Sequence, residues 1–227
     1  RLPIGATACA AVADVDRDGD LDLVFCAATN PQLFIVRQQA GGTFGAAQLI
    51  SVSGNPADLA VADVNDDGVL DLVAATADGL SVCLGDGVFF ANGVRFAPGN
   101  NAISVDVGDV NEDGFVDLVF AIADAAALGV FIGDGAAGFT DTDTPSTAGL
   151  PLDVRLADVD RDGHLDIVTA ESGDGAAVFV GVGNGAFEAG IAVDSGEPGV
   201  HAGVAVGDVN RDGRPDVIVA TRVQLGQ

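Results

Sequence analysis

The sequence predicts an all-β protein: a β-propeller of four-stranded antiparallel blades with five repeats, of which four are complete and the fifth is incomplete. Three observations predict this class. A motif returns at a nearly constant interval, short apolar runs lie between its copies, and several of these runs are apolar on both alternating faces. The length of 227 residues alone would allow one large core or two small ones.

The repeated motif is rich in aspartate and glycine. It first occurs as Asp14–Gly19 and returns four times, at intervals of 49, 46, 49 and 50 residues. A period of this length is typical of a propeller blade. The predicted repeats are residues 7–55, 56–101, 102–150, 151–200 and 201–227, within a single propeller domain or fragment spanning 1–227.

Each period contains four apolar runs, which predict a four-stranded meander. In the second repeat they are 59–62 before the motif, then 70–74 and 80–84, followed by a Gly-rich turn. The fourth run is weaker and begins with Phe, as in 44–50 and 187–193. Runs such as 72–75 are apolar on both faces, so both faces must be covered, as in sheets stacked around an axis. A β-solenoid is the alternative, although its repeats are usually shorter and its strands parallel.

The closure of such a ring has two possible forms. Residues 1–4 could add a strand to the fifth repeat and complete a five-bladed ring, or the chain could belong to a larger ring. The chain has no initiator Met, which suggests removal of a leader or upstream domain, or a trimmed chain.

Each motif extends to the pattern Asp-x-Asp/Asn-x-Asp-Gly-x-x-Asp, which predicts a calcium loop. Side-chain oxygens at positions 1, 3, 5 and 9 and a backbone carbonyl at position 7 can converge on one ion, and calcium prefers six to eight oxygen ligands. Glycine at position 6 allows the tight turn around it. The predicted ligand residues, one calcium per repeat, are Asp14, Asp16, Asp18, Asp20 and Asp22; Asp63, Asn65, Asp67, Val69 and Asp71; Asp109, Asn111, Asp113, Phe115 and Asp117; Asp158, Asp160, Asp162, His164 and Asp166; and Asp208, Asn210, Asp212, Arg214 and Asp216.

These loops differ from an EF-hand and also explain the acidic composition. An EF-hand requires Glu at position 12, where this chain has Phe25, Ala74, Phe120, Thr169 and Val219. The chain carries 34 acidic residues and a net charge of −25, and such crowded carboxylates would repel one another without a cation. The same charge would repel nucleic acid and anionic membrane surfaces, so neither is an expected partner.

The repeat resembles the FG-GAP/VCBS family of calcium-binding β-propellers, whose blades also occur in integrin α-subunits. Residues 61–73 carry the resemblance, together with the Gly-rich turns before Phe at 41–44 and 183–187. The resemblance covers essentially the whole chain. It implies structural calcium in each blade, a location outside the cell or on its surface, and a role in adhesion or ligand binding.

The three cysteines allow two interpretations. Cys9, Cys26 and Cys83 could be small core residues. Cys9 and Cys26 also flank the first loop at positions that face each other across a hairpin, within reach of a disulfide.

The sequence predicts that the chain is not an enzyme. His164 and His201 have no nucleophile at a recognisable spacing, and the imidazole of His164 is expected to face solvent. No Gly-X-Ser-X-Gly motif occurs. Residues 133–138 match a dinucleotide-binding pattern, but no helix is expected after them, so a hairpin turn is predicted.

The leading functional hypothesis is a secreted or surface-displayed calcium-binding module that takes part in protein–protein interaction. A carbohydrate-binding propeller is the second hypothesis, although Trp and Tyr, which favour sugar binding, are absent. The third is an accessory domain of a secreted or surface enzyme. The expected partner is a protein or glycan, without membrane insertion, and the chain could belong to a larger chain or assembly.

Overall fold

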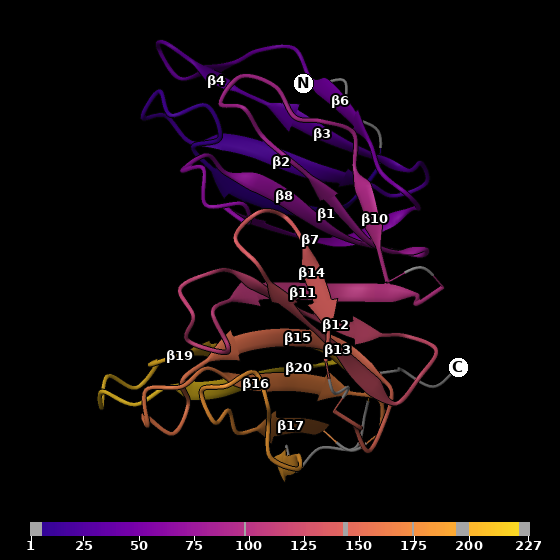
Figure 1. The fold of residues 1–227 in the computed structure, drawn as a ribbon, viewed down its shortest axis with the longest axis vertical. Coiled ribbons are helices and arrows are strands. Elements are labelled where there is room, and N and C mark those ends of the chain that lie inside the picture. The colour runs from indigo at the N-terminus through magenta and orange to yellow at the C-terminus, as the bar shows by residue number, and fades with distance from the viewer. Residues whose placement is uncertain (1–5, 98, 143–144, 174, 194–199, 223–227) are drawn as a thin grey trace. The chain divides into compact units, whose positions relative to one another are not determined.

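The computed structural model describes residues 6–97, 99–142, 145–173, 175–193 and 200–222 (Figure 1). These residues form strands and turns without a helix, so the described part of the chain contains no helix able to cross a bilayer. The all-β prediction is therefore confirmed for them. The chain divides into two compact units, residues 1–103 and 104–227.

The first unit contains two four-stranded antiparallel sheets. The first sheet has the order β1 (Thr7–Ala13), β2 (Asp22–Ala27), β3 (Gln32–Val36), β6 (Gln48–Ser51). The second sheet consists of β7 (Pro56–Ala62), β8 (Asp71–Thr76), β9 (Gly79–Cys83) and β10 (Val94–Phe96). A small ribbon pairs β4 (Gln38–Gln39) with β5 (Thr43–Phe44).

The second unit repeats the same arrangement. One sheet consists of β11 (Ala102–Gly108), β12 (Asp117–Ile122), β13 (Ala127–Gly133) and β14 (Phe139–Asp141). The next consists of β15 (Pro151–Ala157), β16 (Asp166–Glu171), β17 (Gly175–Phe179) and β18 (Ile191–Val193), and the last is a hairpin of β19 (Val200–Gly207) and β20 (Asp216–Arg222). Four four-stranded sheets and one hairpin confirm the predicted content of the repeats. No sheet among the described residues closes on itself, and the propeller arrangement stays a prediction.

The fourth strand of the first and fourth repeats differs from the prediction. In the first repeat the predicted strand 44–50 is broken, because Phe44 pairs within the β4–β5 ribbon and β6 begins only at Gln48. In the fourth repeat Phe187 forms an isolated bridge with Gly181, and β18 begins at Ile191. The apolar pattern identifies where the fourth run lies but not where hydrogen bonding resumes after the turn.

Burial confirms that the central strands are covered on both faces. Every residue of β8, β12 and β16 is buried. In the first unit, Val24 and Ile35 of one sheet share a core with Leu59 and Leu72 of the other. In the second unit, Val204 of β19 packs on Val168 of β16 in the same way. Sheet-on-sheet packing thus supplies the core of each unit.

A β-bulge interrupts the first strand of several repeats, as between Pro151 and Asp153 of β15. In this bulge the Asp153 carboxylate accepts hydrogen bonds from the Ser104 hydroxyl (2.7 Å) and from the Val204 amide (2.9 Å). These partners lie on β11 and β19, so one side chain connects three successive sheets of the second unit. The sequence pattern did not reveal the bulges, because each adds one residue without disturbing the apolar run.

A disulfide joins Cys9 and Cys26 across β1 and β2, with a Cα–Cα distance of 5.0 Å. This outcome decides between the two interpretations of the cysteines. Cys83 is a buried free thiol. Its pKa is raised to about 12, mainly by desolvation and to a smaller extent by the negative charge of Asp71. The predicted pairing of residues 1–4 with the fifth repeat lies outside the described residues.

The disulfide should contribute measurably to stability. It closes a separation of 17 residues, for which chain entropy predicts about 3 kcal/mol. Replacing both cysteines (Cys9→Ala with Cys26→Ala) should therefore lower Tm by roughly 5–10 °C in a thermal melt. The double variant should be insensitive to reductant, whereas a Cys83→Ala control should keep its sensitivity. An unchanged Tm in the double variant would contradict this contribution.

Candidate metal centre

All five Asp-rich loops share one backbone conformation. Each runs from the end of a repeat's first strand to the start of its second, and two positions in it have positive φ. Position 6 is always glycine, with φ between 79° and 98°. Position 4 is not glycine, yet it also has positive φ, at Arg17 (62°), Asp66 (54°), Glu112 (62°), Arg161 (71°) and Arg211 (63°). A non-glycine residue rarely adopts positive φ, so its recurrence at position 4 of all five loops indicates that the surrounding hydrogen bonds fix the turn.

The aspartate at position 1 supplies part of this constraint. In the third loop Asp109 accepts hydrogen bonds from the amides of Asp113 (3.1 Å) and Gly114 (2.9 Å). The first, second and fifth loops repeat both bonds. In the fourth loop Asp158 accepts instead from Arg161 and Gly163. The position 1 carboxylate therefore satisfies backbone donors at the tip of the turn.

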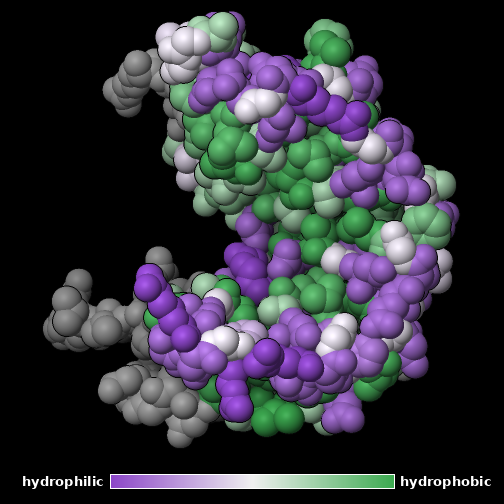
Figure 2. Space-filling view, turned by 90° about the vertical axis from the view of Figure 1, so that its left-hand side faces the viewer, coloured by the Kyte–Doolittle hydropathy of each residue, from purple (hydrophilic) through white to green (hydrophobic). Residues whose placement is uncertain are grey.

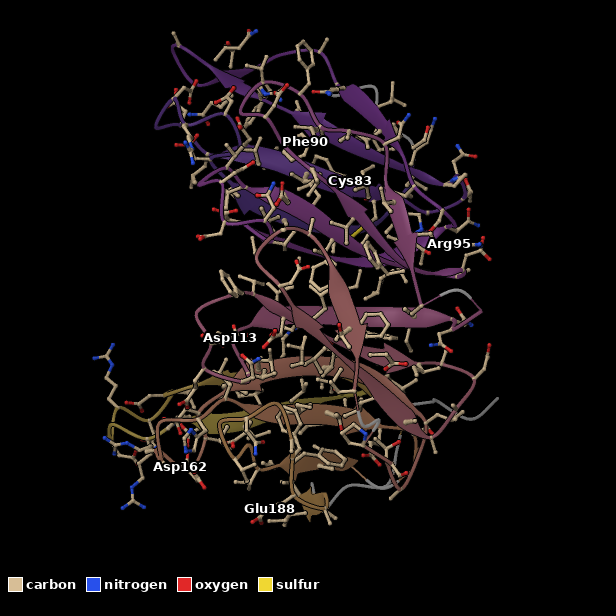
Figure 3. The ribbon with its side chains drawn as sticks, viewed as in Figure 1. Cys83, Phe90, Arg95, Asp113, Asp162 and Glu188 are labelled. Atoms are coloured by element: carbon tan, nitrogen blue, oxygen red, sulfur yellow. A yellow bond between two sulfur atoms is a disulfide. The ribbon has the colours of Figure 1, made fainter. Side chains whose placement is uncertain are left out.

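The aspartate at position 5 orients the second half of the loop. Its Oδ1 accepts the amide of position 7 in every repeat, as from Val69 to Asp67 at 2.7 Å. Its side chain is exposed in all five loops. Asp113 and Asp162 lie at the loop ends of their sheets in Figure 3. In Figure 2 the loop ends of the second unit, in the lower half of the view, face the viewer and are mainly hydrophilic (purple).

The aspartate at position 9 has a second role that the sequence did not reveal. It is the first residue of the second strand, and in the first four repeats it is fully buried. Asp117 accepts the amides of Val110 and Gly133, both at 2.8 Å, and so connects the loop with the end of the third strand. Asp22, Asp71 and Asp166 make the same pair of bonds, and Asp216 accepts from Val209. The signal that could have indicated this role is an aspartate at the start of an otherwise apolar strand.

Burial has a clear effect on these carboxyl groups. Desolvation raises the pKa of Asp71, Asp117 and Asp166 above the usual 3.8, and their backbone N–H donors offset part of this shift. Nearby loop carboxylates, such as Asp113 beside Asp117, raise the pKa further. A positive charge in the loop would oppose this repulsion.

The residue at position 3 divides the loops into two types. In the first and fourth loops the carboxylates of positions 1, 3 and 5 lie within 4.8 Å of one another. In the second and third loops position 3 is asparagine, and its amide donates to the aspartate at position 5, at 2.9 Å from Asn65 and 2.8 Å from Asn111. Asn210 of the fifth loop turns instead toward Asp216 (3.3 Å). The sequence analysis treated all five loops as equivalent.

The oxygen donors of these loops fit a hard divalent cation such as calcium. A carboxylate has about four lone-pair sites, so oxygens that already accept an N–H retain capacity for a metal. One atom supports this fit directly, because Asp16 Oδ1 is buried and has no hydrogen-bond partner. Positions 1, 3, 5 and 9 and the position 7 carbonyl are the groups that could hold the ion.

His164 at position 7 of the fourth loop makes a contact that the sequence did not predict. Its imidazole lies at the surface, where Nδ1 contacts the Glu112 carboxylate at position 4 of the third loop. A hydrogen bond with Glu112 is the main cause of its raised pKa.

Residues 133–138 form the β13–β14 turn, in which Asp134 Oδ1 accepts the amides of Ala136 and Gly138. The hairpin interpretation of that segment is confirmed.

The chain matches the model of the FG-GAP-like repeat in four overlapping segments, residues 14–74, 63–120, 110–169 and 158–219. No curated protein matches the chain at a significant level. Each matched segment begins within one loop and ends in the second strand of the following repeat.

Three solved structures have a similar fold. A lectin from Agrocybe aegerita that recognises non-reducing terminal N-acetylglucosamine has a TM-score of 0.64 and 18% identity, over 94% of this chain and 60% of the lectin chain. The V. cholerae biofilm matrix protein Bap1 has a TM-score of 0.54 and 23% identity, over 84% of this chain and 29% of its own. BBS1N, solved in complex with ARL6DN, has a TM-score of 0.58 and 14% identity, over 97% and 77%. The chain thus spans less than two thirds of the lectin and of the matrix protein.

The buried carboxylate should matter for folding without any metal. In Asp166→Ala the amides of Val159 and Gly181 lose their acceptor, which should lower the free energy of unfolding by about 2–4 kcal/mol. Urea unfolding in calcium-free buffer measures this change. The matched control is Asp162→Ala in the same loop, where the side chain is exposed and the loss should stay below about 1 kcal/mol. Equal losses in the two variants would contradict the separate role of position 9.

The raised pKa values also predict a pH dependence. Asp71, Asp117 and Asp166 ionise near 3.8 when unfolded and at higher pH when folded, so the folded state binds more protons between these values. Without calcium, stability should fall as pH rises from about 4 through the folded pKa values, and level off above them. Thermal melts in calcium-free buffer across this range test the trend. Asp117→Asn should remove the share of one of the three groups, and Asp113→Asn should weaken the trend less, because it removes only one of the charges that raise the pKa of Asp117. Stability that rises with pH over this range would contradict the prediction.

Proposed function

This chain belongs to the family of FG-GAP-like repeats, and from that premise we propose that it is a calcium-stabilised β-propeller, or a piece of one, that binds a partner outside the cell without catalysing a reaction. The observation that carries the proposal is the fivefold recurrence of one acidic loop whose carboxylates lie close together. Backbone partners account for the aspartates at positions 1, 5 and 9, but not for the crowding of three carboxylates within 4.8 Å in the first and fourth loops, which a cation would relieve.

Calcium accounts for both the donor set and the charge. Seventeen of the 34 acidic residues occupy loop positions 1, 3, 5 or 9. Five calcium ions would change the formal charge from −25 to about −15. Bound there, calcium would neutralise the carboxylates that the fold brings together, and the positions 1 and 9 aspartates would hold the loop in the conformation that receives it.

The propeller arrangement is supported by the sheets themselves. Each unit is built from consecutive four-stranded meanders that pack face to face through apolar side chains. The central strands are buried on both faces, which suits sheets stacked around an axis. The similarity to solved structures that are longer than this chain is compatible with a ring that includes further repeats.

The location outside the cell is supported by two independent features. The Cys9–Cys26 disulfide suits an oxidising compartment. Calcium sites of extracellular modules bind at about 10⁻⁴–10⁻³ M, a concentration range that exists outside the cell and not in cytosol.

A binding role is supported by the proteins of similar fold, which include a lectin and a biofilm matrix protein. The partner could be a protein or a glycan. The similarity to the lectin favours the glycan alternative, whereas the absence of Trp and Tyr does not. A glycan array that includes terminal N-acetylglucosamine separates the two, since binding blocked by the free sugar would establish lectin activity.

Calcium should stabilise the protein strongly. Five sites at 2 mM calcium, with dissociation constants of about 10⁻⁴–10⁻³ M, together supply roughly 3–9 kcal/mol. Tm in 2 mM CaCl₂ should therefore exceed Tm in excess EGTA by roughly 10 °C or more. The measurement is a thermal melt at pH 7.5, with 2 mM MgCl₂ as the ionic control.

Loop variants make the same experiment specific. Asp18→Ala and Asp162→Ala should each reduce the calcium-dependent gain by about the share of one site while leaving Tm in EGTA nearly unchanged. Equal melting temperatures in EGTA and calcium, with both variants unaffected, would show that the loops are ordinary acidic turns.

A further inference from the structure

Arg37 lies directly after β3 and contacts three parts of the first unit. Its Nε is 3.1 Å from Asp16 Oδ2, at position 3 of the first loop. One terminal nitrogen donates to Gln48 Oε1 of β6 (2.9 Å), and the other donates to the Val88 carbonyl (2.5 Å). Val88 belongs to the turn after β9, in the second repeat. The guanidinium therefore connects a predicted metal ligand with the following repeat.

The other repeats carry an apolar residue at this place. In each of the first four repeats, one amide donor to the position 9 aspartate lies at or just after the end of the third strand. These donors are Gln38, Gly85, Gly133 and Gly181. The preceding residue is Arg37 in the first repeat, and Leu84, Ile132 and Val180 in the others. In the second unit Ile132 lies against Gly185 of the next turn through its methyl group. Arg37 replaces that apolar contact with a charged one.

The pair that Arg37 forms with Asp16 is incomplete. Arg37 Nε is close to Asp16 Oδ2 but not aligned for a hydrogen bond, and Asp16 Oδ1 is buried without any hydrogen-bond partner. Both side chains are about one-fifth to one-quarter exposed (21% and 24%). The carboxylate is thus only partly satisfied, and it can accept a cation in place of the guanidinium.

We propose that Arg37 lowers the calcium affinity of the first loop, so that this loop fills only at higher calcium and its filling loosens the contact with the turn at 86–89. The inference rests on the proposed calcium binding and concerns how one site is regulated. A calcium ion that uses Asp16 must either displace the guanidinium or bind beside its positive charge, and both weaken binding. Displacement would also release the Val88 carbonyl from Arg37.

The fourth loop provides the internal comparison. It has the same three aspartates at positions 1, 3 and 5, and in both loops one oxygen of each lies within 4.8 Å of the others. Among the residues that the structure describes, no arginine forms an ion pair with Asp160, the counterpart of Asp16. Ligand charge alone predicts equal affinities for the two loops. A difference between them that disappears when Arg37 is replaced therefore isolates the effect of Arg37.

The test is a calcium titration of the full chain followed by two-dimensional ¹H–¹⁵N NMR. The amides of Gly19 and Gly163 donate to the position 1 aspartates of the first and fourth loops, so each reports on its own site. In the wild type the midpoint of Gly19 should lie roughly tenfold above that of Gly163. Arg37→Leu, which introduces the residue of the second repeat, should bring the Gly19 midpoint down by roughly tenfold and leave Gly163 unchanged.

Two controls separate the pairing from other effects. Arg17→Gln removes one positive charge from the same loop, from a side chain with no ion pair among the described residues, and should move the Gly19 midpoint by less than about threefold. Arg37→Gln keeps a polar side chain beside Gln48 and should lower the Gly19 midpoint in the same way. It serves as the test if Arg37→Leu folds poorly. The carbonyl ¹³C resonance of Val88, followed in HNCO spectra of the same titration, should shift with the Gly19 midpoint in the wild type only.

The outcomes are distinct. Coincident Gly19 and Gly163 midpoints in the wild type, or a Gly19 midpoint unmoved by both Arg37 variants, would overturn the role of Arg37 while leaving calcium binding intact. A titration in which no loop glycine responds would instead refute calcium binding itself, and this inference with it.

Discussion

A buried carboxylate at the start of the second strand holds each repeat together. In the second repeat Asp71 is fully buried and accepts the amides of Val64 and Gly85. One side chain thereby fixes the loop, the second strand and the end of the third strand relative to one another. A buried backbone N–H without an acceptor is costly, so the position 9 aspartate is required by the hairpin itself. The register of the meander and the position of the metal loop follow from the same residue.

This constraint also explains why the fold and the acidic site are inseparable. Burial of Asp117 raises its pKa, and Asp113 in the same loop adds repulsion. The second, third and fourth repeats therefore keep a carboxylate whose ionised form is disfavoured by burial in order to satisfy their backbone, and each places more carboxylates around it. A cation at the loop would relieve both costs at once. The charge of −25 is then a consequence of repeating one structural element five times, rather than a property of the surface as a whole.

The repeat made much of the fold predictable, because hydrophobic runs and the Asp-Gly turn recur with the same spacing. The strands around the loops follow this pattern closely, as β8 and β20 show. The pattern does not encode where a strand resumes after a Gly-rich turn, which is why Phe44 and Phe187 were assigned to strands that begin later. It also could not assign two roles to the position 9 aspartate, since spacing predicts ligands but not backbone partners. The contacts of His164 and Arg37 depend on neighbouring repeats and left no periodic signal.

Within a shared backbone, the loops can differ in how they treat a cation. The turn is held by side chains at positions 1 and 9, whose partners are backbone amides in every repeat. The position 3 oxygen accepts the position 5 amide in the second to fifth loops. Aspartate and asparagine can both supply this oxygen, so position 3 is aspartate in the first and fourth loops and asparagine elsewhere. An asparagine that donates to position 5 offsets part of the repulsion without a metal, whereas a third carboxylate increases the repulsion and the attraction for a cation together. Arg37 modifies this balance from outside the loop, and it does so at a place where the other repeats need only an apolar contact. Variation is therefore concentrated at positions that tune the site, because those that form the turn cannot change without loss of the hairpin.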